Sequence, residues 1–168
     1  MKKKYNLALV PLKKSNEFVK LASKFSSISE KYLLGNNSYP HVTLYQFEEN
    51  EELINNIWQK VCEQWQYSSI ILHLNTFSYI TFDQNIYWIS LLPSNSEVLH
   101  EMHALIANIL LLPIKQNYDP HLTLISTKNA YYYDEIDKLS NNLKFTIDEF
   151  QLVLGKSDDI GQLTEIIF

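Results

Sequence analysis

The sequence YPHVTLYQF (residues 39–47) returns in altered form as YDPHLTLIS (residues 118–126). Both stretches contain the pattern Pro-His-x-Thr-Leu, with its histidine at His41 in the first and at His121 in the second, about half the chain later. Proline fixes φ and donates no ladder hydrogen bond, so each pattern is typical of a strand that begins next to its proline. The repetition predicts two similar halves, each built around one such strand.

Side chains alternate between the two faces of a strand. His41 and Thr43 are therefore expected on one face, and His121 and Thr123 share a face in the same way. The apolar residues between them can pack under helices, which leaves imidazole and hydroxyl groups to line a common surface. Tyr45 is expected on the face of His41 by the same alternation.

Two imidazoles and two hydroxyls suit displacement at phosphorus. An in-line reaction needs one group to take a proton from the attacking water and another to give a proton to the departing oxygen. Imidazole titrates near neutral pH and can do either, and threonine hydroxyls can bind the non-bridging oxygens. The scheme requires neither a metal ion nor another cofactor. A single His-x-Thr strand would instead indicate a packed histidine, but two copies led by proline favour the catalytic interpretation.

The duplicated motif resembles the 2H phosphoesterase superfamily, the 2′-5′ RNA ligase-like and cyclic phosphodiesterase-like proteins. The resemblance covers nearly the whole chain. It implies a bilobal fold, His41 and His121 as the catalytic pair, and Thr43 and Thr123 as phosphate-binding residues. It also implies a small nucleotide or RNA terminus as partner, most typically one with a 2′,3′-cyclic phosphate. The residues alone do not say which histidine is the base; our working hypothesis gives water activation to His121.

Two alternatives stay open at this point. One is a nucleotide-binding module with little turnover, and the other is a phosphodiesterase for 2′-5′ oligoadenylate or another small cyclic phosphate. Many bacterial relatives carry an arginine shortly after one or both motifs. This chain has 14 lysines and no arginine. Arginine's bidentate fork is not equivalent to lysine. We therefore name Tyr45, Ser126 and Lys128 as candidate substrate-binding residues.

Strands alternate with helices along the chain. We expect strands at 5–11, 41–47, 69–80, 84–92, 121–127, 144–157 and 163–168. We expect helices at 51–65, 94–111 and 134–143. A further helix is expected to begin at Ser15, with the side chain of Ser15 as its N-cap. A hairpin is expected around 82–85. The pattern predicts an α+β fold: two pseudo-symmetric lobes of antiparallel sheet, helices packed outside and a central cleft.

Bulk properties narrow the classes further. A chain of 168 residues is expected to form one domain, over residues 1–168. A formal net charge of −5 lowers the expectation of binding to long RNA or to DNA. No apolar run approaches the roughly 20 residues of a membrane span, and Cys62 is a lone cysteine. These features favour a cytoplasmic monomer with no membrane partner.

His100 and His103 raise the question of a metal site. They are spaced i, i+3 in the expected helix 94–111, but no further ligand set completes a zinc site. We expect no metal and place both histidines on the helix surface. The inward stripe of this helix is expected to be formed by Val98, Met102, Leu105 and Ile109. Lys2–Lys4 are expected to form a mobile tail.

Overall fold

The computed structural model describes residues 1–83, 85–129, 132–140 and 146–168. Its strands are β1 (Lys3–Pro11), β2 (Val42–Glu49), β3 (Ile70–Asp83), β4 (Ile86–Pro93), β5 (Leu122–Thr127), β6 (Thr146–Ser157) and β7 (Leu163–Ile166). Its helices are α1 (Ser15–Ser23), α2 (Ile54–Gln64), α3 (Glu97–Leu110) and α4 (Tyr132–Ser140), with a 3₁₀ turn η1 (Glu51–Leu53). Within these ranges, no helix is long and apolar enough to cross a bilayer.

The strands form one antiparallel sheet that closes on itself. The order of its strands is β1-β2-β5-β4-β3-β6-β7. A further pairing between β1 and β6, the first and the sixth strand in this order, closes the sheet. The junction between β2 and β5 is narrow and consists of the pair Val42 and Leu122. The predicted α+β class with antiparallel strands is confirmed, while its division into two pseudo-symmetric lobes stays a prediction.

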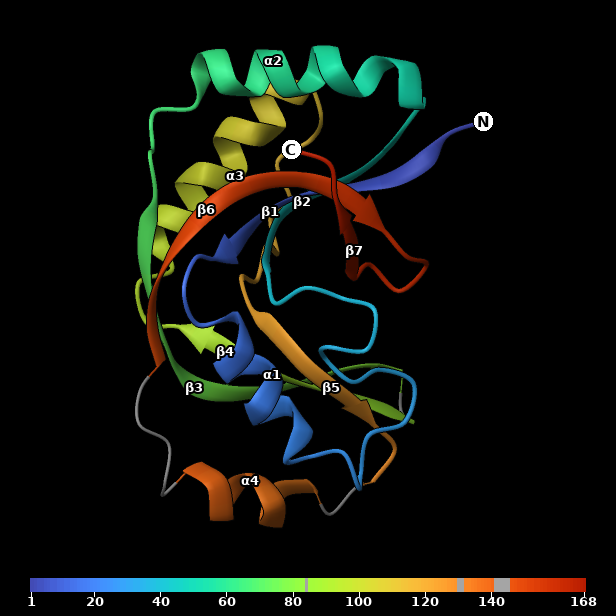
Figure 1. Cartoon of the computed structure of the whole chain (residues 1–168), viewed down its shortest axis with the longest axis vertical. Coiled ribbons are helices and arrows are strands. Elements are labelled where there is room, and N and C mark those ends of the chain that lie inside the picture. The colour runs from blue at the N-terminus through green and yellow to red at the C-terminus, as the bar shows by residue number, and fades with distance from the viewer. Residues whose placement is uncertain (84, 130–131, 141–145) are drawn as a thin grey trace.

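Helices cover the sheet at two ends of the molecule. Figure 1 shows α2 and α3 at one end and α1 and α4 at the other. Helix α3 packs on β2 and against α2, whereas α1 packs on β5. Each helix turns its apolar stripe inward; in α1, for example, the buried residues are Phe18, Leu21 and Ala22. The two motif strands are thus supported from behind by helices that come from distant parts of the sequence.

Each motif strand carries a β-bulge one residue after its threonine. In the pairing of β1 with β2, Leu7 lies opposite Tyr45 and the next residue lies opposite Thr43, which leaves Leu44 as the extra residue. In the pairing of β4 with β5, Leu124 is the extra residue in the same way. A bulge of this kind shifts the alternation of the strand that carries it, so residues beyond the two leucines change faces.

Several predicted bounds need correction. Lys14, not Ser15, is the N-cap residue of α1, and its side chain makes no capping hydrogen bond. The buried carboxylate of Asp148 instead accepts hydrogen bonds from the backbone N–H groups of Lys13 (3.0 Å) and Lys14 (2.7 Å). The tip of the predicted hairpin at residue 84 and the predicted positions 141–145 lie outside the described residues.

Candidate active site

One cavity of about 640 Å³ brings the two motifs together. Both histidines and both threonines line it, although they come from strands that touch at a single pair. The cavity also has a cationic, amide-rich and aromatic lining, which includes Lys31, Gln46, Trp88, Lys115, Asn117, Tyr118 and Gln162. Its volume lies within the range typical of small-molecule sites.

The two imidazoles are held in the same way. His41 Nδ1 lies 2.8 Å from the carbonyl oxygen of Tyr39, and His121 Nδ1 lies 2.7 Å from the carbonyl oxygen of Asp119. A carbonyl can only accept, so in each ring Nδ1 carries the proton that it donates. In a neutral ring Nε2 then has a free lone pair.

The proline of each motif explains this repeated geometry. Pro40 and Pro120 are buried and stand between each histidine and the carbonyl that it binds. Their fixed φ restricts how the preceding carbonyl lies relative to the imidazole that follows. The Pro-His order is therefore a device for orienting the ring.

The two histidines differ in environment. His41 is 6% exposed, and burial lowers its pKa from 6.5 to about 4, against the opposing effect of the hydrogen bond to Tyr39. A positive charge on His121 lowers the pKa of His41 further. The side chain of His121 is 30% exposed, and its Nδ1 lies 4.0 Å from an oxygen of the Asp119 carboxylate. The cavity thus pairs a buried, neutral imidazole with a more exposed one that has an anionic neighbour.

Thr43 is oriented by a residue that the sequence analysis did not select. The fully buried Asn6 on β1 donates from Nδ2 to Thr43 Oγ1 at 3.1 Å. The threonine oxygen accepts this bond, so its own proton is left for another acceptor in the cavity. Thr123 on the other motif strand is 8% exposed and lies opposite Ser90.

The prediction for Tyr45 is wrong, because the bulge at Leu44 reverses the alternation. Tyr45 is 5% exposed, its ring stacks on His103 of α3, and its hydroxyl donates to the carbonyl of Pro113 at 2.8 Å. Gln46 takes the expected place and lines the cavity. No glycine or proline marks this bulge in the sequence, so alternation alone could not reveal it.

Of the other two candidates, neither lines the cavity. Ser126 is fully buried, and its hydroxyl has no hydrogen-bond partner among the described residues. Lys128 is exposed beyond the end of β5. The cations that do line the cavity are Lys31 and Lys115, which come from connecting segments. The absence of arginine near the motifs was the one signal that another cation should be sought.

His103 is also not where it was expected. It is 1% exposed, because the buried stripe of α3 consists of Leu99, Met102, His103, Ile106 and Ala107. Its Nδ1 lies 2.7 Å from the carbonyl of Leu44, and its Nε2 accepts from the backbone N–H of Lys115 at 3.0 Å. His103 therefore joins the bulge to the segment that leads into the second motif. Within the described part of the chain, no cluster of His, Cys, Asp or Glu could hold a metal ion.

Comparison with known sequences bears on this site. A profile of the 2′-5′ RNA ligase superfamily matches residues 14–159. The chain belongs to this superfamily. It is therefore one of the 2H phosphoesterases, as the duplicated motif indicated. No curated protein gives a significant sequence match.

Solved structures share the fold of this superfamily member. E. coli LigT in its apo form superposes with a TM-score of 0.65 at 11% identity, covering 99% of this chain and 95% of that one. LigT complexed with 3′-AMP superposes with a TM-score of 0.61 at 11% identity, covering 94% of this chain and 88% of that one. A structure described as a phosphoesterase superposes with a TM-score of 0.59 at 12% identity, covering 93% of this chain and 89% of that one. At such identities the likeness establishes the fold.

Proposed function

We propose that the protein is a metal-independent phosphodiesterase that hydrolyses a nucleotide or RNA-end phosphodiester, in particular a 2′,3′-cyclic phosphate. One observation carries this proposal: both imidazoles and both threonine side chains converge on one cavity, with each Nδ1 bound to a carbonyl and each Nε2 left for proton transfer. Membership of the 2′-5′ RNA ligase superfamily and the fold shared with LigT, which binds 3′-AMP in one crystal structure, support a nucleotide substrate.

His41 is the base in this proposal and His121 the acid. A base must be neutral before the reaction, and burial favours the neutral form of His41 by lowering its pKa to about 4. An acid must reach the departing oxygen with a proton, and His121 is the more exposed of the two rings, with its Nδ1 4.0 Å from an oxygen of the Asp119 carboxylate. This reverses our sequence-based hypothesis, which had no information on burial.

The reaction then balances without a further reactant. Water attacks phosphorus while its proton passes to Nε2 of His41. The bond from phosphorus to one ribose oxygen breaks, and that oxygen receives the proton from Nε2 of His121. The product is a phosphomonoester, and each ring returns to its starting state by exchange with solvent.

The threonines hold the phosphate during this step. Because Asn6 already donates to Thr43 Oγ1, the hydroxyl proton of Thr43 is free to bind a non-bridging oxygen. Thr123 supplies the second donor from the opposite strand. Negative charge that builds on these oxygens in the transition state strengthens both bonds.

Hydrolysis of the four nucleoside 2′,3′-cyclic monophosphates in the presence of EDTA tests the proposal. We expect turnover by the wild type and a loss of about 10²–10⁴-fold in kcat for His41→Asn and for His121→Asn, which keep a donor near Nδ1 but lack Nε2. The exposed His73 provides a matched control, and His73→Asn should retain full activity. Activity that survives both motif substitutions would contradict the mechanism. Tight nucleotide binding without turnover by the wild type would favour a binding module instead.

A further inference from the structure

The cavity lined by both motif histidines adjoins a second cavity of about 370 Å³. The two share four lining residues, Gln46, Lys115, Ile160 and Gly161. The motif histidines and threonines line the first cavity only. Lys115 therefore stands where the cavities meet, at the border of the first cavity.

Lys115 is held in place by its backbone and by a ring, not by an acid. Its N–H donates to Nε2 of the buried His103 at 3.0 Å, and its Nζ lies 5.0 Å from the centroid of the Tyr45 ring. No ion pair joins it to a carboxylate among the described residues. Lys115 is an exposed residue, and its charge is available to an anion.

His103 in turn is fixed on both sides. Its ring stacks between those of Tyr45 and Tyr118, with ring centroids 5.2 Å and 4.2 Å away. The Tyr118 hydroxyl donates to the carbonyl of Thr43 at 2.7 Å. The bond from Lys115 requires an unprotonated Nε2, so the ring is neutral and Nδ1 donates to Leu44. These contacts fasten the segment between α3 and β5 to the first motif strand.

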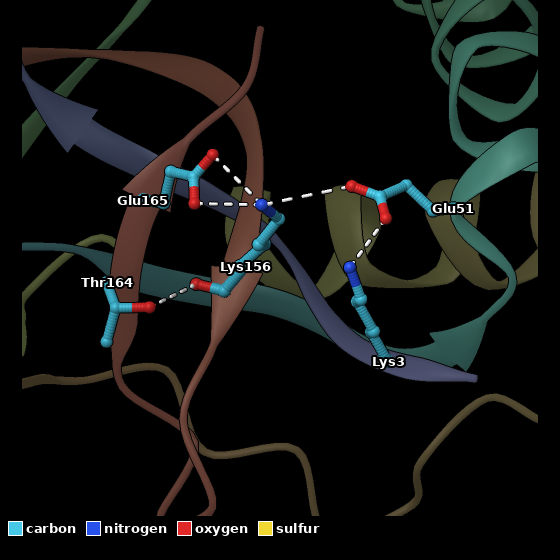
Figure 2. A network of polar contacts seen from close by, with 5 residues as sticks. All are labelled: Lys3, Glu51, Lys156, Thr164 and Glu165. Atoms are coloured by element: carbon cyan, nitrogen blue, oxygen red, sulfur yellow. Dashed lines mark hydrogen bonds and ion pairs between the residues drawn. The ribbon is translucent and has the colours of Figure 1, made fainter. Parts of the chain in front are cut away.

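The lysines in and beside the second cavity differ from Lys115, because each has a carboxylate partner. Figure 2 shows Lys3 and Lys156 bound to acidic side chains of η1 and β7. The ion pairs along this side, among the described residues, are Lys2–Glu49, Lys3–Glu51, Lys4–Asp159, Lys156–Glu51 and Lys156–Glu165. Their charges are largely compensated, so this side offers little attraction to a long polyanion. The expectation that Lys2–Lys4 form a mobile tail is wrong for Lys3 and Lys4, which belong to β1.

We propose that Lys115 binds a second phosphate of the substrate, on the 5′ side of the nucleotide whose cyclic phosphate lies between the histidines. This inference rests on the proposed function. The reacting phosphate has its donors in the two threonines, whereas Lys115 lies at the border of the same cavity with its charge unpaired. A nucleoside separates its 2′,3′ and 5′ oxygens and can connect these two positions. The substrate class is thus a 5′-phosphorylated cyclic nucleotide or the last nucleotide of a short RNA.

Binding of two unreactive probes tests the inference. We expect the wild type to bind a nucleoside 3′,5′-bisphosphate about tenfold more tightly than the nucleoside 3′-monophosphate, as measured by titration calorimetry, since one charge-assisted contact is gained. Lys115→Met should remove this preference and Lys115→Arg should retain it. Lys20 is an exposed helix residue, so Lys20→Met serves as a matched control that keeps the preference. Equal affinity of the wild type for both probes, or a preference that survives Lys115→Met, would overturn the inference.

Kinetics separate this inference from the proposed function. Nucleoside 2′,3′-cyclic phosphates with and without a 5′-phosphate are compared as substrates of the wild type. Turnover of both with equal KM would overturn the second-phosphate site and leave the phosphodiesterase in place. Turnover of neither, with the bisphosphate preference and its loss in Lys115→Met intact, would overturn the proposed function while supporting the second-phosphate site.

Discussion

Replacing His41 with Asn should flatten the dependence of folding stability on pH. Asparagine can still donate to the carbonyl of Tyr39 but does not titrate. In the wild type, burial lowers the pKa of His41 from 6.5 to about 4. Between these values the unfolded chain binds a proton at this ring and the folded chain does not, so the free energy of unfolding falls as the pH falls.

The size of the effect follows from the pKa. One pKa unit corresponds to about 1.4 kcal/mol, so protonation of His41 opposes folding by about 3 kcal/mol in full. Between pH 7 and about pH 4.5 the wild type should lose about 2 kcal/mol more than His41→Asn. That is a large part of the roughly 5–15 kcal/mol typical of a domain.

Urea unfolding followed by tryptophan fluorescence at the two pH values measures this difference. Carboxylates titrate in both proteins, and the comparison cancels their contribution. His73 is exposed, so His73→Asn should follow the wild type at both pH values. If His41→Asn and the wild type lost the same free energy of unfolding, burial would not be holding His41 neutral, and its assignment as base would fail.

Substitutions at three further positions probe the supports of the cavity. Asn6→Asp replaces a donor to Thr43 by an acceptor that captures the threonine proton; kcat/KM for a cyclic nucleotide should fall by about tenfold, and an unchanged value would refute this role. His103→Leu should lower the free energy of unfolding by about 2–4 kcal/mol. His103→Gln, which keeps a donor and an acceptor, should lower it by less. Equal melting temperatures for the wild type and His103→Leu would argue against the two hydrogen bonds. Gly161 has φ +85°, and an added Cβ would lie 2.8 Å from Nε2 of Gln46, so Gly161→Ala should cost about 1–2 kcal/mol in urea unfolding, and wild-type stability would contradict this.

Much of the fold and the heart of the cavity could be predicted from local pattern. Alternation placed His41 with Thr43 and His121 with Thr123, and each pair does line the cavity. The helices and strands begin and end within a few residues of their predicted bounds. These features depend on neighbours in the sequence, which is why the sequence alone shows them.

The errors concern contacts between distant residues. Ser15 does not cap α1, and Asp148 binds the two backbone N–H groups just before the helix, because the folded sheet brings β6 to that point. The buried stripe of α3 includes His103, because a polar ring is tolerated inside when both nitrogens are bound. Lys115 reaches the cavity from a connecting segment whose path no periodicity describes. Each case required knowledge of what lies across the fold.

The paired bulges mean that the number of residues between two side chains of a motif strand does not by itself say whether they share a face. Leu44 is an extra residue that lets Thr43 and Gln46 face one cavity although they are three residues apart. If Leu44 were kept but the bulge were lost, every later side chain of β2 would turn to the opposite face. Deleting Leu44 should instead leave a regular strand in which Gln46, now two residues after Thr43, still faces the cavity. Related chains that lack this one residue should therefore present the same side chains to the cavity.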